Sequence, residues 1–306
     1  MKTSLLDKEM RDFVERYLEA CGLSTATSIA QQRVDYEAML QAFRYPHPAG
    51  VTTRDEIVDG RHGPIPLRHY RYRGGDSRVL LLFLHGGGFM LGSLDSHDDI
   101  CAELCAGTGF DLVSVGYRLS PENHHPVHLD DVDDAFGHCA QARTILIGAS
   151  AGATLAAALS WRRRQAEHRA CAQVLIYPSL GGDLLELPAY REHADAPLLS
   201  TEDIRFYRSI RCKNGVLPLE DPEFYPLLAR DFSGCPPTVA LSADIDPLRD
   251  DARVYVEKLT AAGVKASWVN EPGLVHDYLR ARHVSQRARE AFANICAAVT
   301  ELASTA

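Results

Sequence analysis

The stretch TILIGASAGATLAAALSWRRR, Thr144 to Arg164, changes in its middle from strand-forming to helix-forming residues. It predicts a strand over 144–148 and a helix over 151–164. Between them lies GASAG, in which glycines on either side of Ser150 permit the sharp turn that holds a nucleophilic hydroxyl clear of the backbone. A glycine-rich turn of this kind can also cradle a phosphate, so a catalytic reading needs a base, an acid and an oxyanion site elsewhere in the chain.

The surrounding chain alternates between strand and helix patterns. An antiparallel hairpin is predicted over 51–73, and the apolar run RVLLLFLH (78–85) predicts a strand buried on both faces. Further strands are predicted at 111–117, 172–178, 237–243 and 265–270, and further helices at 129–140, 250–262 and 285–303. This order predicts an α/β fold with a mostly parallel central sheet and helices on both of its faces.

Two segments interrupt the alternation. Residues 1–45 begin with an amphipathic helix over 5–20, and residues 182–228 contain several prolines and a short helix over 201–210. We expect both to form a helical cap over the strand ends, with 46–181 and 229–306 as the catalytic core; ordinary peripheral helices are the alternative. Their apolar side chains are expected either to line a pocket or to form the core of the cap: Phe13, Tyr17, Met39, Leu40, Phe43, Leu198, Leu199, Phe206 and Tyr207.

Composition excludes several classes of protein. The 306 residues carry a formal charge of -9, which would repel nucleic acid. The charged N-terminal stretch lacks the apolar core of a signal peptide, and no run of apolar residues is long enough for a membrane span, so a cytoplasmic protein without membrane insertion is expected. The eight cysteines form no C-x-x-C pair, and Cys101 and Cys105, one helical turn apart, are interpreted as packing residues.

Three further features supply what Ser150 needs. HGGGFMLG (85–92) follows a predicted buried strand and provides glycine-loop amides that can face the serine, together with the amide of Ala151. Downstream, Asp244 and Asp246 come just past one strand and His276 just past the next. The carboxyl ends of parallel strands share one edge of the sheet, so these side chains are expected near Ser150.

Histidine is abundant in this chain, and one cluster of histidines has to be considered as a metal site. His124, His125 and His128 precede Asp130 and Asp131, and such a group can bind metal. Its spacing matches no common zinc pattern and it leads directly into a predicted helix, so no metal and no cofactor is expected.

The motifs together resemble the hormone-sensitive-lipase-like family of α/β-hydrolase esterases, which includes bacterial acetyl esterases and carboxylesterases. The matching segments are HGGGF (85–89), GYRLSPENHHP (116–126), GASAG (148–152), IYP (176–178), DPLRD (246–250) and VHDYL (275–279). They stand in the family's order and span about two thirds of the chain. The resemblance implies the α/β-hydrolase fold with a helical cap.

The resemblance also assigns roles. It makes Ser150 the nucleophile, Asp246 the acid and His276 the base. It places the oxyanion hole at the amides of Gly87, Gly88 and Ala151, with Gly86 a weaker candidate. Pro121 and Glu122 then belong to a supporting turn, and Asp130 or Asp131 to structure near the site.

Two positions depart from the family pattern. Ala149 stands where relatives commonly have an acidic residue, as in GDSAG, and Asp277 stands where the residue after the histidine is often glycine. The change at 149 removes a nearby charge, and the carboxylate of Asp277 can raise the pKa of the neighbouring base or tilt its ring. Both departures concern rate and pH dependence more than the identity of the site.

The expected function is hydrolysis of small carboxylic esters with short acyl chains through an acyl-enzyme, by a monomer or homodimer. Short acyl chains are implied by the resemblance alone. An amidase of the arylformamidase type is the alternative within enzymes, because the same residues cleave activated amides. A ligand-binding descendant of the fold is the alternative outside enzymes, but it predicts the loss of one of the three residues, and all three are present.

Overall fold

The computed structural model describes residues 5–21 and 28–305, which are built around one sheet of eight strands. The strands are β1 Val51–Gly60, β2 Gly63–Tyr72, β3 Asp76–Leu84, β4 Phe110–Val115, β5 Thr144–Ala149, β6 Ala172–Ile176, β7 Thr238–Ile245 and β8 Ala266–Val275. The helices are α1 Lys8–Cys21, α2 Ile29–Leu40, α3 Asp98–Thr108, α4 Val127–Cys139, α5 Ala151–Arg162, α6 Ala189–Glu192, α7 Thr201–Ile210, α8 Arg249–Ala261 and α9 Gln286–Thr305.

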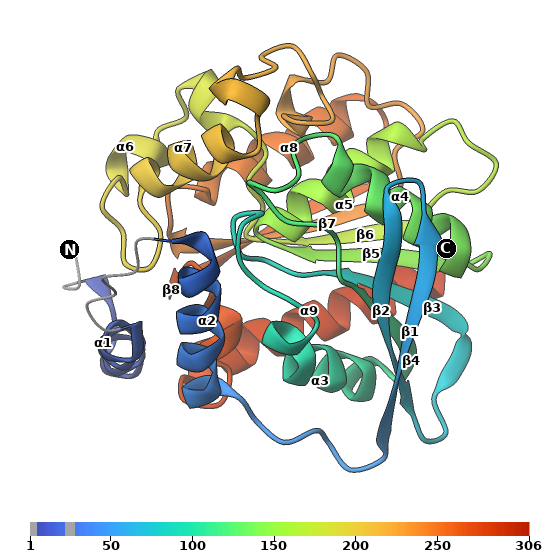
Figure 1. Ribbon diagram of the computed structural model, residues 1–306, viewed down its shortest axis with the longest axis horizontal. Helices are drawn as coiled ribbons and strands as arrows, with labels where there is room; N and C mark the ends of the chain where they lie inside the picture. Colours follow the sequence, from blue (N-terminus) through green and yellow to red (C-terminus); the bar gives the residue numbers. More distant parts are fainter. Residues whose placement is uncertain (1–4, 22–27, 306) are drawn as a thin grey trace.

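The sheet is mostly parallel, as predicted. Its order is β1-β2-β4-β3-β5-β6-β7-β8; β1 pairs antiparallel with β2, and β2 with β4, while every other neighbouring pair is parallel. Helices α3 and α9 cover one face and α4, α5 and α8 cover the other (Figure 1). The α/β-hydrolase architecture expected from the sequence is therefore present.

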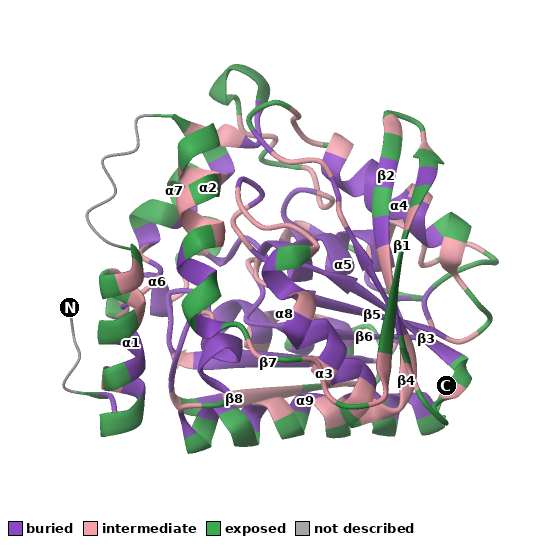
Figure 2. Ribbon diagram, turned by 60° about the horizontal axis from the view of Figure 1, so that its bottom comes forward, coloured by how far each residue is buried: buried purple, intermediate pink, exposed green. Residues whose placement is uncertain are grey.

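The strand β3 shows why its sequence is apolar throughout. Leu81 and Phe83 belong to the core on the α3/α9 face, whereas Leu80, Leu82 and Leu84 belong to the core on the opposite face. Side chains alternate across a strand, so only a strand covered on both sides needs an unbroken apolar run. Figure 2 shows the central strands buried and the outer faces of the helices exposed.

Most of the predicted elements are confirmed to within a few residues. Helix α3, which the sequence reading did not assign, carries Cys101 and Cys105, and both are fully buried as the packing interpretation predicted. Among the described residues, no helix combines the length and hydrophobicity that a bilayer-spanning helix requires.

Helices α2, α6 and α7 lie beyond one end of the central strands (Figure 1). Arg33 of α2 joins this end to the core: its Nε donates to the Met90 carbonyl at 2.8 Å, and Nη2 donates to the Ser120 carbonyl at 2.8 Å and to Glu122 at 2.7 Å. Glu122 thus connects the 116–126 segment to α2. This contact is one physical basis for the supporting role that the resemblance implied.

Two adjacent carboxylates at the start of α8 anchor the segment 180–190. Asp251 Oδ2 accepts hydrogen bonds from the amides of Leu180, Gly181 and Gly182 at 2.6, 3.1 and 3.3 Å. Asp250 accepts from the Ala189 amide at 3.0 Å. Burial raises the pKa of Asp251 to about 7, although the amides favour its ionised form.

The raised pKa of Asp251 predicts a pH-dependent stability. In the unfolded chain this carboxyl ionises near its ordinary pKa of 3.8, so between that pH and about 7 the folded state holds one more proton than the unfolded state. Rising pH therefore destabilises the wild type across this window, and the penalty is constant above it. Asp251→Asn has no such proton to lose, and its melting temperature relative to wild type should rise by about 2 °C or more from pH 5 to pH 8.

Asp250→Asn is the matched control, because ionic and backbone contacts outweigh burial and lower the pKa of Asp250. The Asp250 carboxyl is ionised in both the folded and the unfolded state from pH 5 to pH 8. The difference in melting temperature between Asp250→Asn and wild type should therefore not change with pH. Thermal melts of wild type and the two variants at pH 5 and pH 8 test this prediction. A difference in melting temperature between Asp251→Asn and wild type that does not change with pH would contradict it.

Candidate active site

Ser150 occupies a strained turn between β5 and α5. Its backbone lies at φ 53° and ψ −116°, a conformation that residues other than glycine rarely adopt. The flanking glycines are needed because the elements approach too closely for a side chain. A Cβ at position 148 would lie 2.3 Å from the Gly152 carbonyl oxygen, and one at position 152 would lie 2.0 Å from that of Leu84.

The three residues expected to form the site lie in one hydrogen-bonded row. His276 Nε2 is 2.9 Å from Ser150 Oγ, and His276 Nδ1 is 2.7 Å from Asp246 Oδ2. Asp246 is fully buried, and its other oxygen accepts from the Leu248 amide at 2.9 Å. A buried carboxylate in this position fixes the tautomer and the orientation of the imidazole.

Asp244, the other acid of the same stretch, lies elsewhere. It falls inside β7 and not past its end as expected, and it accepts hydrogen bonds from the Asn270 side chain at 2.9 Å and the Gly273 amide at 3.2 Å. The structure thus brings only the second aspartate to the histidine.

The glycine loop after β3 lies beside the serine. A Cβ at Gly86 would be 3.5 Å from Ser150 Cβ, and the turn of the loop is closed by the amide of Leu91, which donates to the Gly87 carbonyl at 2.8 Å. Within the described part of the chain, no acceptor is bonded to the amides of Gly87, Gly88 or Ala151. The Gly86 amide, in contrast, donates to His97 Nε2 at 3.4 Å.

His85 helps to hold this loop in place through its contacts with Tyr117. Its ring stacks on Tyr117 with centroids 4.3 Å apart, and the Tyr117 hydroxyl donates to the His85 carbonyl at 2.7 Å. Burial lowers the pKa of His85 to about 4, so the imidazole is neutral at physiological pH. The first residue of the HGGG motif and the tyrosine of GYRLSPE therefore act together to hold the glycines.

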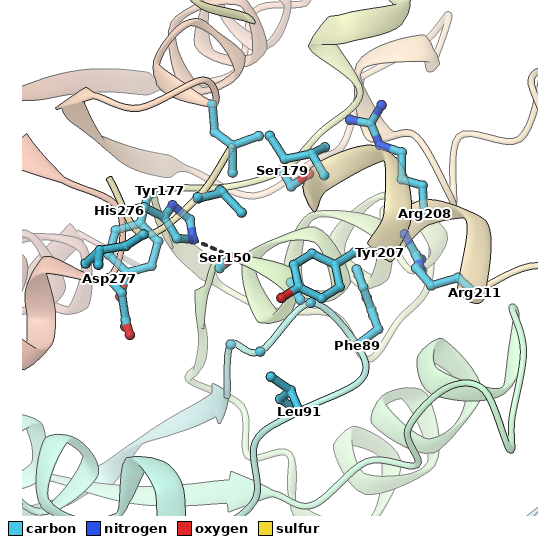
Figure 3. Close-up of a pocket in the computed structure, with 18 of the residues that line it drawn as sticks. Phe89, Leu91, Ser150, Tyr177, Ser179, Tyr207, Arg208, Arg211, His276 and Asp277 are labelled. Atoms are coloured by element: carbon cyan, nitrogen blue, oxygen red, sulfur yellow. Dashed lines mark hydrogen bonds between the residues drawn. The ribbon is translucent and has the colours of Figure 1, made fainter. Parts of the chain in front are cut away.

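Ser150 and His276 open into a cavity of about 100 Å³ (Figure 3). Both of the peripheral segments contribute to its lining. Of the side chains considered from the sequence, those that line it are Tyr17, Leu198, Leu199 and Tyr207. The aromatic and aliphatic residues 13, 39, 40 and 43 are buried in the core instead, and Phe206 is exposed.

The two positions that depart from the family pattern have different environments. Ala149 is fully buried in the core on the α3/α9 face. Asp277 lines the cavity in a left-handed backbone conformation, and its carboxylate pairs with the buried Arg280, whose Nε is 3.3 Å away. The carboxylate next to the base is therefore held by a guanidinium.

Sequence reasoning missed several residues of the cavity, above all Arg208 and Arg211 near the end of α7. Cations near a helix C-terminus are common because they interact favourably with the helix dipole, so these two carried no distinctive signal. Tyr36, from α2, and Phe224, beyond α7, were missed as well. Their places depend on contacts between segments far apart in sequence.

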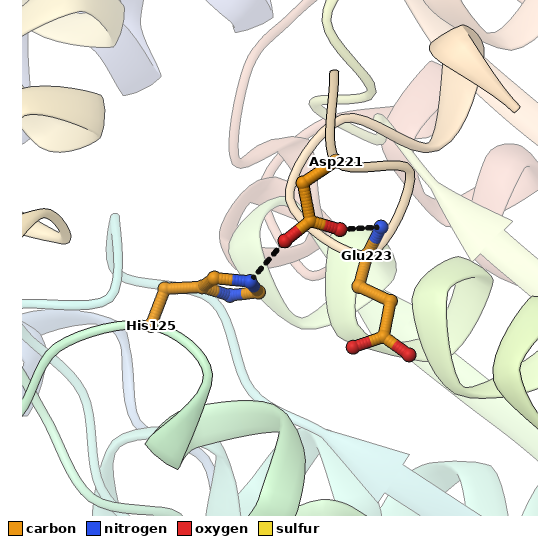
Figure 4. Close-up of side chains that lie close together, drawn as sticks. All are labelled: His125, Asp221 and Glu223. Atoms are coloured by element: carbon orange, nitrogen blue, oxygen red, sulfur yellow. Dashed lines mark hydrogen bonds and ion pairs between the residues drawn. The ribbon is translucent and has the colours of Figure 1, made fainter. Parts of the chain in front are cut away.

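The histidine cluster forms local polar contacts. His125 Nε2 lies 2.9 Å from Asp221 Oδ2, and Glu223 stands close by (Figure 4). The Glu223 carboxylate, however, makes hydrogen bonds of 2.8 and 2.6 Å with Arg162. His128 is buried against Ser120, 2.9 Å away, so the three histidines considered from the sequence do not share one site.

Comparison with known proteins gives the same family. The model of the alpha/beta hydrolase fold family matches residues 81–280. The esterase LipI of Mycobacterium tuberculosis is 35% identical over 252 residues, which cover 78% of this chain and 78% of LipI. The ethyl acetate hydrolase of Pseudomonas putida is 32% identical over 269 residues, which cover 82% of this chain and 81% of that enzyme.

Solved structures agree with the sequence relatives. A hyperthermophilic esterase from the archaeon Pyrobaculum calidifontis superposes with a TM-score of 0.86 at 29% identity, covering 97% of this chain and 99% of the other. The ester hydrolase EH1AB1 from the metagenome of Lake Arreo gives a TM-score of 0.88 at 28% identity, covering 98% and 99%. With its eight-stranded sheet and its serine turn, this chain belongs to the alpha/beta hydrolase fold family, in the branch of the hormone-sensitive-lipase-like carboxylesterases.

Proposed function

We propose that this chain hydrolyses carboxylic esters with short acyl chains, with Ser150 as the nucleophile. The observation that carries the proposal is the hydrogen-bonded row of Ser150, His276 and Asp246 beside three backbone amides that have no acceptor among the described residues. The names of the relatives, which are esterases and ester hydrolases, support ester hydrolysis as the reaction.

The first half of the proposed cycle acylates the serine. His276 Nε2 takes the proton of Ser150 as the hydroxyl oxygen attacks the ester carbonyl, and Asp246 stabilises the imidazolium that forms. The carbonyl oxygen becomes negatively charged, and the amides of Gly87, Gly88 and Ala151 donate hydrogen bonds to it. When the tetrahedral intermediate collapses, the C–O bond breaks and the alcohol leaves with the proton from His276.

The second half repeats these steps with water. His276 takes a proton from a water molecule that attacks the acyl carbonyl, and the same amides hold the second oxyanion. Collapse releases the carboxylic acid and returns the proton to Ser150.

Replacement of the nucleophile gives the most direct test. Ser150→Ala should lower kcat for p-nitrophenyl butyrate by at least about four orders of magnitude, because no other hydroxyl of residues 5–21 and 28–305 is bonded to His276. It should also abolish covalent labelling by a fluorophosphonate, measured by intact-protein mass spectrometry. Ser179 lines the same cavity, and the control variant Ser179→Ala should still be labelled. Full activity in Ser150→Ala would contradict the proposal.

Replacement of the acid tests the row itself. Asp246→Asn keeps the size of the side chain but places an amide opposite His276 Nδ1 and favours the wrong tautomer, so kcat should fall by about 10³- to 10⁴-fold. Asp244→Asn is the matched control, because Asp244 is bonded to Asn270 and Gly273 instead. Steady-state kinetics should show a far larger loss for position 246, and equal losses at both positions would contradict the assignment.

The size of the cavity predicts the acyl preference. A cavity of about 100 Å³, bounded by Tyr207 and Leu198, accommodates a short chain more readily than a long one. In a series of p-nitrophenyl esters from acetate to palmitate, kcat/KM should peak at or below hexanoate. A maximum at palmitate would contradict this prediction.

The same assays separate esters from amides. Activity on p-nitrophenyl acetate and on an N-formyl aromatic amine can be compared side by side, and a clear preference for the amide would favour an arylformamidase-like reaction. We favour the ester because the relatives with the same fold are named for ester hydrolysis.

A further inference from the structure

Arg211, the residue that follows α7, is a buried cation with no anionic partner in the part of the chain that the structure describes. Its side chain is 2% exposed, and Nε and Nη2 have no hydrogen-bond acceptor among the described residues. The guanidinium lies between two aromatic rings, with its central carbon 3.6 Å from the centroid of Phe89 and 4.0 Å from that of Phe224. Burial lowers the pKa of Arg211 to about 9, so the group still carries its charge at neutral pH.

The neighbouring charges do not neutralise Arg211. Arg208, one turn earlier on α7, forms an ion pair with Asp183, and on the other side Asp277 is paired with Arg280. Burial lowers the pKa values of His125 and His128, which keeps both rings uncharged near neutral pH. Stacking on two rings offsets part of the cost of burying the guanidinium, but aromatic faces accept no strong hydrogen bond from its N–H groups.

The unpaired guanidinium belongs to the cavity that contains the serine. Arg211, Ser150 and His276 all line it. In the view of Figure 3, Arg208 and Arg211 lie on one side, His276 and Asp277 on the other, and Ser150 between them. Phe89, whose ring lies against Arg211, directly follows the glycines of the candidate oxyanion loop, so an anion at Arg211 would lie in the same cavity as the reacting carbonyl, on the side away from Asp277 (Figure 3).

We propose that Arg211 binds a carboxylate carried by the substrate, which makes anionic esters the preferred substrate class of this enzyme. The proposal rests on the ester hydrolysis proposed above and specifies its substrate. Guanidinium–carboxylate hydrogen bonds are strong because both partners are charged, and they are stronger still where water is excluded. A neutral ester of equal size would leave the buried N–H groups of Arg211 without acceptors, which is the kind of loss that produces large discrimination.

The carboxylate can stand on either half of the ester, and two matched pairs of substrates distinguish the halves. Mono-(4-nitrophenyl) adipate carries it on the acyl chain, with 4-nitrophenyl hexanoate as the neutral counterpart. 4-Acetoxybenzoate carries it on the alcohol half, with 4-methylphenyl acetate as the neutral counterpart. Each pair exchanges a methyl group for a carboxylate, and any difference in intrinsic reactivity within a pair cancels when variants are compared with wild type.

The measured quantity is the ratio of kcat/KM for the anionic ester to that for its neutral counterpart. Arg211→Met should lower this ratio in at least one pair by about 10- to 100-fold relative to wild type, the range for losing a hydrogen bond between charged groups. Arg205→Met, which removes an exposed cation from the same helix, should leave the ratio as in wild type. Ratios in Arg211→Met equal to wild type in both pairs would overturn the proposal.

A binding measurement separates this proposal from the catalytic one. In Ser150→Ala, calorimetry should show tighter binding of adipic acid monoamide than of hexanamide, or of 4-acetamidobenzoate than of 4-methylacetanilide. The preference should vanish in Ser150→Ala/Arg211→Met. If this preference appears while wild type hydrolyses no ester, the proposed reaction fails and the anion site stands; if esters are hydrolysed without the preference, the anion site fails.

A purely structural role of Arg211 is tested by the same variants. Arg211→Lys keeps the charge, so it should retain more of the anionic preference than Arg211→Met, whereas a stacking role alone would leave both variants with the wild-type ratio. Circular dichroism and thermal melts establish that the variants fold. If neither Arg211 variant folds, the binding measurement on Ser150→Ala alone decides, because equal binding of anionic and neutral ligands to it overturns the proposal.

Discussion

The close approach of backbones around Ser150 is the constraint on which the site depends. The start of α5 lies so near the ends of β3 and β5 that neither position 148 nor position 152 has room for a Cβ. This packing holds Ser150 at a positive φ and leaves the Ala151 amide at the first turn of the helix without an intrahelical acceptor. The same contact sets the glycine loop after β3 beside the serine. The same packing therefore positions both Ser150 and the glycine loop beside it.

The sequence predicted the sheet well because each strand carries its own signal. RVLLLFLH reads as a doubly buried strand without any knowledge of its neighbours, and the serine turn, Asp246 and His276 stand at strand ends that the alternation of elements brings to one edge. The residues of the hydrogen-bonded row were therefore predictable, although the choice between Asp244 and Asp246 needed the family pattern. The strand predicted over 237–243 extends through Ile245 in the structure, so Asp244 lies within β7 and Asp246 directly follows it.

The rest of the cavity was not predictable in the same way. Arg211, Tyr36 and Phe224 reach it from segments whose positions depend on contacts across the chain, such as those of Arg33 with Met90 and Ser120. A cation just after a helix looks the same in sequence whether water or two aromatic rings surround it. Arg208 and Arg211 are both buried, and the ion pair of Arg208 with Asp183 is what distinguishes them.

The two sides of the cavity are fastened to the core by attachments of unequal strength. On one side, the segment 180–190 is held by Asp250 and Asp251, whose contacts to backbone amides are buried. Helix α2 is held by Arg33, whose partner Glu122 is half exposed and whose ion pair is screened by salt. Salt therefore weakens the ion pair that joins α2 to the 116–126 segment more than it weakens the buried contacts that hold the 180–190 segment.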